Sequence, residues 1–306
     1  MSERRGVLVM AYGTPASLDD VEAYYTDIRG GRAPSPEHLS ELTARYRAIG
    51  GRSPLLEITR SQAAGIQERL DGIDSYVGQK HAAPTIPDAV RAMEVDGIEE
   101  AVGLVLAPHY SDMSIGDYEK RVRAAAQAGG WKGRFRMIPS WHLEPGFIAL
   151  LAAHVRAALE QIPVAARAET VVVFTAHSLP ATIVDDGDPY PDQLQATAEA
   201  VAIAAGLEHW QIGWQSAGRT SAVWLGPDLL EIMVELAAKS TPAVVVCPCG
   251  FVSDHLEVLY DIDVEAKALA ADLEIELVRT ASPNDDPAFL DVLASVVGRT
   301  FADLDR

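Results

Sequence analysis

The chain has 306 residues, of which 48% are hydrophobic and 23% charged, a composition that fits one large globular domain or two smaller ones. Its 44 acidic and 25 basic residues give a net charge of −19. This charge argues against a nucleic-acid partner, because phosphate binding needs a basic surface. No apolar run approaches the roughly 20 residues that span a bilayer, so we expect no transmembrane segment. The apolar run Val7 to Ala11 is too short for a signal peptide, and we expect a cytoplasmic protein.

Short apolar runs alternate with longer helical stretches along the chain. The predicted strands are residues 6–11, 74–79, 101–107, 134–139, 170–175, 210–214, 243–247 and 274–279. Stretches rich in Ala, Leu, Glu and Arg predict helices between them, for example over 85–96, 145–161 and 191–205. The strands are Val-rich and barely alternate, as in TVVVFT and AVVVC, which is typical of strands buried on both faces of a parallel sheet. The pattern predicts a doubly wound α/β fold.

The eight predicted strands divide into four plus four, with a break near residues 160–170. We therefore expect two similar α/β domains, residues 1–160 and 161–306, with the last helix (286–303) crossing back to the first domain. LVLAPHYSDMSIGDYEKR and VVVCPCGFVSDHLEVLYDID both run strand, Pro, loop, Ser-Asp and helix, which favours an internal duplication. Neither half carries GxGxxG after its first strand, so a dinucleotide site lacks its main support.

About 60 residues separate the first two predicted strands, which is far more than a βα unit needs. This stretch contains a Gly-, Pro- and Arg-rich insertion over 16–56, with DIRGGRAPSPEH and RYRAIGGRSP. In open α/β sheets, ligands bind beyond the carboxyl ends of the strands. We therefore expect the insertion to form the rim of a site.

The segment FVSDHLEVLYDIDVE, residues 251–265, predicts a helix with an acidic face. At about 100° per residue, four carboxylates fall within an arc of roughly 80°: Asp254, Glu257, Asp261 and Glu265. Stacked like charges destabilise a helix, and a solvated face is the plain explanation. The helix dipole favours acids only within the first turn, and Asp261 and Glu265 lie beyond it, which argues against this explanation.

Two residues at the start of this segment have separate expectations. Asp254 fits the N-cap of the helix better than a ligand position. His255 lies about 160° round the predicted helix from Glu257, so we expect it on another face with no metal role.

His177, in TAHSLP, directly follows a buried strand at the expected carboxyl edge of a sheet. Taken alone, it fits a structural loop histidine as well as a ligand. The adjacent Ser178 suggests a Ser-His hydrolase, but the GxSxG elbow of such enzymes is missing. A histidine together with a carboxylate such as Glu257 is a suitable ligand set for a borderline divalent metal such as Fe²⁺.

Cys247 and Cys249 flank Pro248 in a predicted strand and cannot readily bridge each other, so a disulfide framework is excluded. Small buried thiols are the plain interpretation of the pair. Among the other histidines, which form no HxxxH or HxH pair, His109 in APHYSD is the candidate pocket residue.

Several motifs occur together and in order along the chain: VLVMAYGTP, YYTDIRGGRAPSPEHL, RYRAIGGRSPL, YVGQKHAAP, LAPHYSDMS, TAHSLP, GWQSAGRT and GFVSDHLEVLYDID. Together they resemble the ferrochelatase family, and in particular the coproporphyrin ferrochelatases of Gram-positive-type bacteria. Protoporphyrin-type members usually end the first strand in a Met-Gly turn, whereas this chain has Tyr12-Gly13. The resemblance implies a chelatase-like fold of two Rossmann-like domains, each with a four-stranded parallel sheet flanked by helices, and a porphyrin cleft between them.

The resemblance also implies roles for individual residues. His177 and Glu257 would bind the incoming Fe²⁺ and help to remove the pyrrole protons. Tyr12 would ligate iron from the opposite face of the porphyrin, and Asp261 and Glu265 would form a route for hydrated cations. The positions implied to hold the porphyrin and its propionates are Tyr12, Arg29, Arg45, Tyr46, Ser53 and Tyr118.

The implied reaction is the insertion of Fe²⁺ into coproporphyrin III to form coprohaem III in haem biosynthesis, with the macrocycle bent and its protons removed. Fe²⁺ is a substrate, and no cofactor is expected to be permanently bound. A [2Fe–2S] cluster on four cysteines is not expected, because the chain has two. We expect a transient hand-over of the product to a coprohaem decarboxylase. Arg52, in GGRSP, has no role that the motif assigns.

Three other functions stay open at this point. The first is a ferrochelatase that prefers protoporphyrin IX. The second is a non-catalytic porphyrin or haem carrier. The third is a chelatase for another tetrapyrrole, although such enzymes usually rely on paired histidines.

Overall fold

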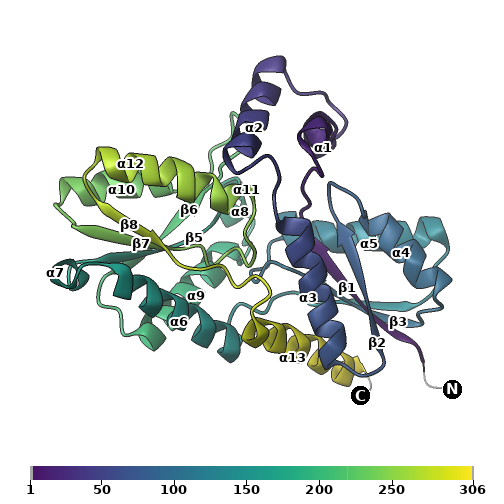
Figure 1. Cartoon of the computed structure of the whole chain (residues 1–306). Coiled ribbons are helices and arrows are strands. Elements are labelled where there is room, and N and C mark those ends of the chain that lie inside the picture. Colours follow the sequence, from purple (N-terminus) through teal and green to yellow (C-terminus); the bar gives the residue numbers. More distant parts are fainter. Residues whose placement is uncertain (1–2, 219, 305–306) are drawn as a thin grey trace. The chain divides into compact units, whose positions relative to one another are not determined.

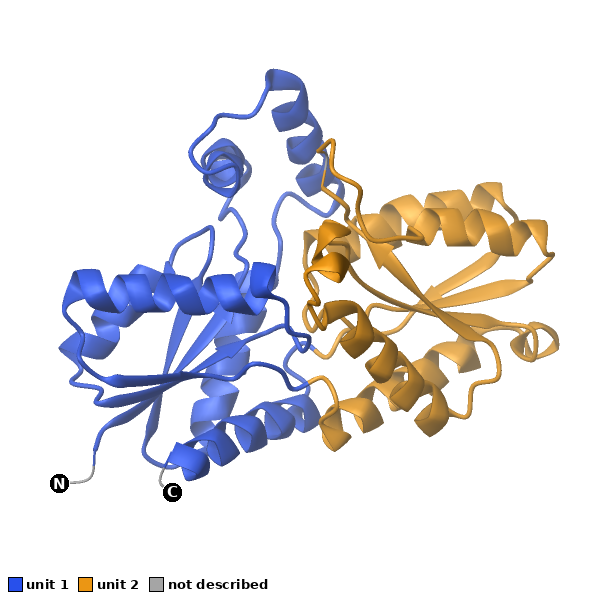
Figure 2. Ribbon diagram, turned by 180° about the vertical axis from the view of Figure 1, so that it is seen from behind, with its two compact units in different colours: residues 1–141, 284–306 blue, residues 142–283 orange. Residues whose placement is uncertain are grey.

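A computed structural model describes residues 3–218 and 220–304, and the chain divides into two compact units (Figures 1 and 2). Unit 1 comprises residues 1–141 and 284–306, and unit 2 comprises residues 142–283. Each unit is built around its own four-stranded parallel sheet. The predicted α/β class, with two Rossmann-like units of four strands each, is confirmed.

Unit 1 has the strand order β2-β1-β3-β4, and all neighbouring strands are parallel. Its strands are β1 (Arg5–Ala11), β2 (Ile73–Gln79), β3 (Glu100–Val105) and β4 (Arg134–Met137). The two central strands, β1 and β3, are apolar without alternation after a charged first residue, and they are almost fully buried. This pattern is what a sheet covered by helices on both faces requires.

The helices of unit 1 cover both faces of this sheet. They are α1 (Val21–Ile28), α2 (Pro36–Ala48), α3 (Leu55–Arg69), α4 (Ile86–Val95), α5 (Asp117–Gly129) and α13 (Pro287–Leu304). Helices α4 and α5 pack together on one face, and α3 and α13 pack together on the other (Figures 1 and 2). Helices α1 and α2 form a separate pair that projects from the sheet, and both lie in the predicted insertion.

Unit 2 repeats the same order with β6-β5-β7-β8, again all parallel. Its strands are β5 (Val171–His177), β6 (Trp210–Gln215), β7 (Ala243–Cys247) and β8 (Glu276–Arg279). Its helices are α6 (Pro145–Gln161), α7 (Val164–Arg167), α8 (Thr182–Asp185), α9 (Tyr190–Ala205), α10 (Leu229–Ala238), α11 (Leu256–Leu259) and α12 (Lys267–Asp272). Helices α6 and α9 cover one face of the sheet, and α10 and α12 cover the other (Figure 1).

The boundary between the units differs from the one that the sequence suggested. We expected it at residue 160, whereas the structure places it between residues 141 and 142. The reason is that α6 packs against α9, β7 and β8, all of them in unit 2. The last helix, α13, belongs to unit 1, where it packs on α3 and β3.

The two units share a further detail, which lies after the third strand of each. A π-helical segment, Asp112–Gly116, leads into α5 in unit 1, and a second one, Asp261–Ala266, leads into α12 in unit 2. These are the two stretches whose sequences resemble each other. The equal strand orders and the matching π-helical segments are consistent with an internal duplication.

The acidic segment 251–265 is not the single α-helix that its spacing predicted. It contains the short α11 and then the π-helical segment, in which the Glu265 N–H donates to the Tyr260 carbonyl at 2.9 Å, five residues back. A π-helical segment breaks the 100° spacing of an α-helix. The prediction of one continuous acidic face was therefore wrong.

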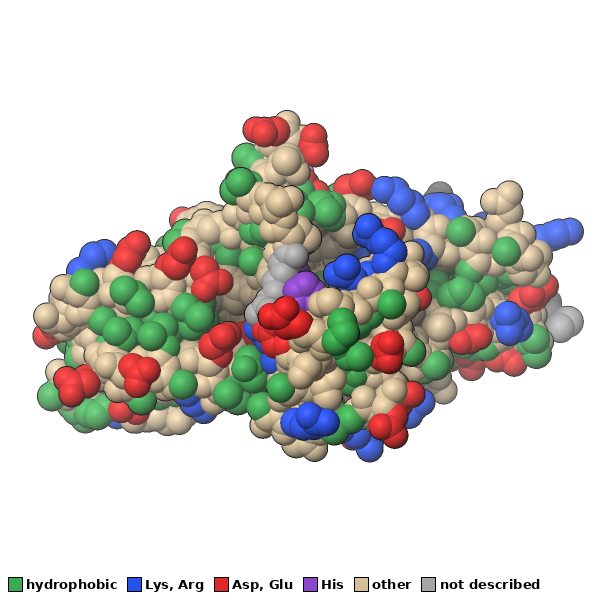
Figure 3. All heavy atoms as spheres, turned by 90° about the horizontal axis from the view of Figure 1, so that it is seen from above, with side chains coloured by type: hydrophobic (Ala, Val, Ile, Leu, Met, Phe, Trp, Pro, Cys, Tyr) green, Lys and Arg blue, Asp and Glu red, His purple; other side chains and the backbone are tan. Residues whose placement is uncertain are grey.

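The surface carries the acidic charge in a scattered form. In the face that Figure 3 presents, acidic side chains (red) are spread over the surface with basic ones (blue) among them. Within residues 3–218 and 220–304, no helix combines the length and the apolar character that a membrane crossing needs.

Candidate active site

The centre of the candidate site in unit 2 is a histidine–carboxylate pair. His177 is the last residue of β5, and Glu257 lies in the first turn of α11, which follows β7. Because β5 and β7 are parallel neighbours, their carboxyl ends lie at the same edge of the sheet. His177 Nδ1 is 3.0 Å from Glu257 Oε2, and each side chain keeps about a third of its surface exposed, 34% and 31%. The structure thus brings together the two residues that the sequence singled out.

The pair changes the proton affinity of both groups. Burial on its own would lower the pKa of His177, but the charge of Glu257, the hydrogen bond to it and the charge of Asp261 together raise this pKa above its ordinary value of 6.5. Burial would raise the pKa of Glu257, but His177 and His255 outweigh it and hold the pKa of this carboxyl far below its usual range. The arrangement therefore raises the proton affinity of the imidazole and keeps the carboxylate ionised.

His255 lies next to Glu257, and the expectation that it points to another face was wrong. Its Nε2 is 3.8 Å from Glu257 Oε2, and its Nδ1 is 3.0 Å from the carbonyl oxygen of Ser253. The reason is that the helix begins at Leu256, so His255 has an extended backbone with φ −158° and ψ −177°. The turn-forming Ser253-Asp254 pair was the sequence signal for this later helix start.

Asp254 is also not the N-cap that we expected. His255 occupies the N-cap position, and its side chain makes no capping hydrogen bond. Asp254 instead accepts hydrogen bonds from Arg279 at 3.2 Å and from the Ser282 hydroxyl at 2.8 Å. These contacts tie it to the end of β8 and to the segment after that strand, and Asp254 lies outside the helix.

Unit 1 places Tyr12 beside two basic residues at the carboxyl end of its own sheet. Tyr12 directly follows β1, its surface is 42% exposed, and its ring centre is 4.6 Å from that of His81. Lys80 Nζ lies 5.9 Å from the centre of the Tyr12 ring and 5.2 Å from that of Tyr118. Burial raises the pKa of Tyr118 well above its ordinary value, so this phenol stays protonated.

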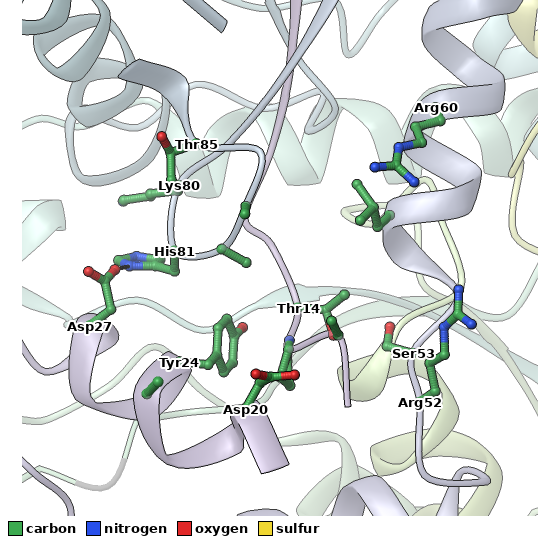
Figure 4. Close-up of a pocket in the computed structure, with 16 residues that line it drawn as sticks. Thr14, Asp20, Tyr24, Asp27, Arg52, Ser53, Arg60, Lys80, His81 and Thr85 are labelled. Atoms are coloured by element: carbon green, nitrogen blue, oxygen red, sulfur yellow. Dashed lines mark hydrogen bonds and ion pairs between the residues drawn. The ribbon is translucent and has the colours of Figure 1, made fainter. Parts of the chain in front are cut away.

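A pocket of about 600 Å³ lies within unit 1, bordered by α1, α3 and the loops that follow β1 and β2 (Figure 4). Arg52, Ser53 and Arg60 line one side, whereas Lys80 and His81 line the loop after β2. Pockets of this size commonly hold small organic ligands. Basic and apolar lining residues together suit an apolar ligand that carries negative groups.

Comparison with known proteins assigns the family. The sequence matches the family model for ferrochelatase over residues 4–300. The chain belongs to the ferrochelatase family. It is therefore a metal-inserting lyase, and Fe²⁺ and a porphyrin are its substrates rather than resident cofactors.

Curated relatives match this ferrochelatase along nearly its whole length. The ferrochelatase of Herpetosiphon aurantiacus is 46% identical over 302 residues, which cover 97% of this chain and 99% of that protein. The coproporphyrin III ferrochelatase of Geobacillus kaustophilus is 47% identical over 305 residues, with 97% and 96% covered. The coproporphyrin III ferrochelatase of Listeria monocytogenes serotype 4b is 44% identical over 309 residues, with 99% and 100% covered.

Among solved structures, the sirohydrochlorin chelatase SirB from Bacillus subtilis subspecies spizizenii, in complex with cobalt, matches with a TM-score of 0.62. It is 11% identical and covers 97% of this chain and 95% of that one. SirB from Bacillus subtilis with Fe³⁺ matches with a TM-score of 0.60 at 12% identity, covering 98% of each chain. At these identities the likeness concerns the fold alone, and it confirms the chelatase-like fold class.

In this ferrochelatase, two further acidic residues, Asp261 and Glu265, follow the His177–Glu257 pair along the chain. Asp261 is 8% exposed and accepts a hydrogen bond from the Ser216 hydroxyl. Glu265 is half-buried at the far end of the π-helical segment. Among residues 3–218 and 220–304, no three or more His, Cys, Asp and Glu side chains gather into one metal-binding group. Asp261 is nevertheless close enough to His177 for its charge to raise the pKa of that imidazole.

The residues expected to hold the porphyrin are distributed over several elements of unit 1. Ser53 is buried and lines the pocket, and Tyr46 is buried with its hydroxyl 3.3 Å from that of the pocket-lining Thr14. Arg45 lies 3.6 Å from Glu41 on the same helix. Arg29 ends α1 with its guanidinium over the Tyr25 ring, and its buried Nε has no hydrogen-bond partner among the described residues. Of these, the structure brings Ser53 to the pocket wall.

The sequence did not indicate the polar side chains that hydrogen-bond to the backbone of His177 and Glu257. The Tyr190 hydroxyl donates to the His177 carbonyl at 3.0 Å. The Gln215 amide donates to the Glu257 carbonyl at 2.9 Å and accepts from the Thr175 hydroxyl at 2.8 Å. Thr175 and Gln215 are buried polar residues near the carboxyl ends of β5 and β6, and this position was the signal that could have identified them.

The two cysteines are buried and free. Burial raises the pKa of Cys247 to about 12 and that of Cys249 well above its ordinary value. Thiols of this kind remain protonated and make poor nucleophiles or metal ligands. His109, the candidate pocket residue, is 1% exposed and does not line the pocket in unit 1.

Proposed function

We propose that this ferrochelatase inserts Fe²⁺ into coproporphyrin III and forms coprohaem III in haem biosynthesis. The observation that carries the chemistry is the His177–Glu257 pair, whose nitrogen and oxygen are 3.0 Å apart at the carboxyl edge of the sheet. The substrate choice is supported by the relatives of Geobacillus kaustophilus and Listeria monocytogenes, both named coproporphyrin III ferrochelatase. Tyr12 in the turn after β1, where protoporphyrin-type enzymes usually carry Met, supports the same choice.

In the proposed mechanism, His177 in its neutral form accepts one pyrrole proton as the metal enters the macrocycle, and the second pyrrole proton passes to solvent. Two N–H protons must leave for each Fe²⁺ that binds the four ring nitrogens, so a base near the metal is required. Glu257 stabilises the imidazolium that forms, because it raises the pKa of His177. The hydrogen bonds from Tyr190 and Gln215 fix the backbone of the pair and preserve this geometry.

Other residues have supporting roles in the proposal. Asp261 and Glu265 attract hydrated Fe²⁺ to the edge of unit 2, since carboxylate oxygens suit a hydrated divalent cation. In unit 1, Tyr12 acts as a further iron ligand. The residues proposed to hold the propionates are Arg29, Arg45, Tyr46, Ser53 and Tyr118. The product, which still carries its propionates, passes by transient contact to a coprohaem decarboxylase in the cytoplasm.

The test is anaerobic Fe²⁺ insertion into coproporphyrin III, followed by the change in porphyrin absorbance. We expect turnover by the wild type and its near-complete loss in His177→Ala and Glu257→Gln. His209→Ala, which changes a histidine just before β6 at the end of the strand away from the pair, is the matched control and keeps wild-type turnover. Absence of turnover in the wild type would leave a porphyrin carrier, and unchanged turnover in both variants would refute the assigned pair.

A further inference from the structure

One wall of the pocket in unit 1 combines an apolar surface with two arginines. Arg52 and Ser53 precede α3, and Leu56 and Arg60 lie four residues apart on it. Residues at i and i+4 share a helix face, and both Leu56 and Arg60 line the pocket. The apolar side chain of Leu56 and the guanidinium of Arg60 therefore share one wall of the pocket, and Arg52 and Ser53 lie just before this helix.

Arg60 differs from the other basic residues of the pocket in having no counter-charge. Arg52 donates to Glu57, Lys80 Nζ is 2.7 Å from Asp117, and His81 Nδ1 is 2.7 Å from Asp27. For Arg60, the part of the chain that the structure describes offers neither an ion pair nor a hydrogen bond. A protein with a net charge of −19 thus keeps one uncompensated cation in this pocket.

The rest of the lining is mixed: polar and acidic residues lie among apolar ones, namely Thr14, Asp20, Tyr24, Asp27 and Thr85. Small apolar residues contribute much of the wall: Pro15, Ala16, Ala23, Ala82 and Ala83. Figure 4 shows the Arg60 guanidinium directed from α3 toward the loop that carries Lys80 and Thr85, across the hollow. A ligand with an apolar body and an anionic group at its edge would satisfy both features.

We propose that Arg60 binds one peripheral carboxylate of the substrate, and that its guanidinium and the carboxylate form a bidentate ion pair with two hydrogen bonds. A planar guanidinium matches the geometry of a carboxylate, which makes arginine better suited than lysine to this contact. The inference rests on the proposed function in one respect, namely that the ligand is a porphyrin with carboxylate side chains. Arg60 thereby contributes to the choice of a tetracarboxylic over a dicarboxylic porphyrin.

The experiment measures porphyrin affinity by fluorescence titration, without iron, for the wild type and four single variants. Arg60→Gln is expected to weaken coproporphyrin III binding about tenfold, as expected for the loss of a charge-assisted pair, and Arg60→Lys to recover part of it. Arg52→Gln is expected to have an effect below about threefold, because Glu57 already engages Arg52 in an exposed ion pair. Arg91→Gln, an exposed arginine on α4 outside the pocket, controls for the change in net charge.

Two further readouts separate an anchor from a merely structural residue. Affinity for coproporphyrin III should fall with added salt in the wild type and fall less steeply in Arg60→Gln, because a partly exposed ion pair is screened. Protoporphyrin IX, with fewer carboxylates, should lose less affinity than coproporphyrin III in the same variant. The thermal midpoint should not change, since Arg60 has no partner to lose.

Wild-type affinity in Arg60→Gln, or an equal loss in Arg91→Gln, would overturn the inference. Iron insertion by the wild type is measured alongside. If the wild type inserts iron while Arg60→Gln binds normally, the anchor fails and the proposed function stands. If the wild type binds coproporphyrin III through Arg60 but inserts no iron, the anchor stands and the proposed function fails.

Discussion

In each unit a histidine lies against a carboxylate near the carboxyl edge of the sheet, yet the pKa values of the two imidazoles are shifted in opposite directions. His177 lies 3.0 Å from Glu257 in unit 2, and His81 lies 2.7 Å from Asp27 in unit 1. The pKa of His177 is raised, whereas the pKa of His81 is lowered. An ion-pair partner alone therefore does not decide whether a histidine serves as a base.

The surrounding charges explain the difference. Burial lowers both pKa values, but His177 has a second acidic neighbour, Asp261, whereas His81 has the cations Lys80 and Arg121 nearby. Unit 2 thus holds an imidazole whose charged form is stabilised once it has accepted a proton. Unit 1 offers a neutral imidazole, which suits the packing of an aromatic ring such as Tyr12.

Exchanging the two carboxylates for amides should break the comparison most strongly. Glu257→Gln removes the group that raises the pKa of His177, so we expect this pKa to fall and iron insertion to drop at least about 100-fold, the usual contribution of a general base. Asp27→Asn, the matched change in unit 1, should reduce turnover far less. NMR titration of the imidazoles and the absorbance assay measure both effects, and equal losses of turnover in the two variants would contradict this assignment.

The π-helical segments of the two units provide the next comparison. Arg279 holds the segment in unit 2 through Asp263, at 2.8 and 3.1 Å, and through Asp254, and its side chain is 14% exposed. Arg279→Gln removes the cation that these two partly buried carboxylates share, although Lys267 stays 3.2 Å from Asp263, and we expect a loss of about 2 kcal/mol in unfolding free energy. We also expect a several-fold loss of turnover, because this segment carries Asp261.

The corresponding contact in unit 1 is a control for this prediction. Lys120 pairs with Asp112 of the other π-helical segment at 2.9 Å, but both side chains are about two-thirds exposed, 65% and 67%. Exposed ion pairs contribute little to stability, so Lys120→Gln should leave the denaturation midpoint unchanged. Equal shifts of the denaturation midpoint in Lys120→Gln and Arg279→Gln would show that burial does not distinguish the Lys120 contact from the Arg279 contacts.

The opposite pKa shifts also predict opposite dependences of stability on pH. A raised histidine pKa stabilises the fold below the ordinary value of 6.5, and this stability is lost as pH rises through the pKa of folded His177. A lowered histidine pKa means that the unfolded chain binds the proton more tightly, so stability falls as pH drops below 6.5 toward the pKa of folded His81. Thermal midpoints should therefore fall less on the alkaline side in His177→Gln and less on the acidic side in His81→Gln. Parallel pH profiles for these variants and the wild type would contradict the two shifts.

The smallest expected effect concerns the outermost acid. Glu265→Gln removes one charge from the edge of unit 2 without touching the His177–Glu257 pair. We expect KM for Fe²⁺ to rise a few-fold with kcat unchanged, and the difference to shrink with added salt, because a cation is attracted through solvent. A fall in kcat with unchanged KM would assign Glu265 to the chemical step instead.

Much of the fold could be predicted from the sequence because its strongest signals are local. The Val-rich runs of β5 and β7 indicated buried parallel strands, and the alternation with helices indicated the α/β class. The unit boundary could not be placed in this way, because the sequence pattern of helix α6 would be the same whichever of the two sheets it covered. Only its packing on α9, β7 and β8 assigns it to unit 2.

The site was predictable to a similar degree. His177 ends β5 and Glu257 comes after the neighbouring strand β7, so the topology brings them to one edge of the sheet. His255 was misplaced because a continuous α-helix was assumed, whereas the helix starts one residue later and then widens into a π-helical segment. Arg60 carried no motif at all, and its isolation from any counter-charge is visible only in the folded pocket.

The central claim is tested most directly by a competition between coproporphyrin III and protoporphyrin IX for limiting Fe²⁺ with the wild-type protein under anaerobic conditions. The account predicts that iron enters coproporphyrin III preferentially and that coprohaem III is the main product. Preferential formation of haem from protoporphyrin IX, or no metal insertion into either porphyrin, would contradict it.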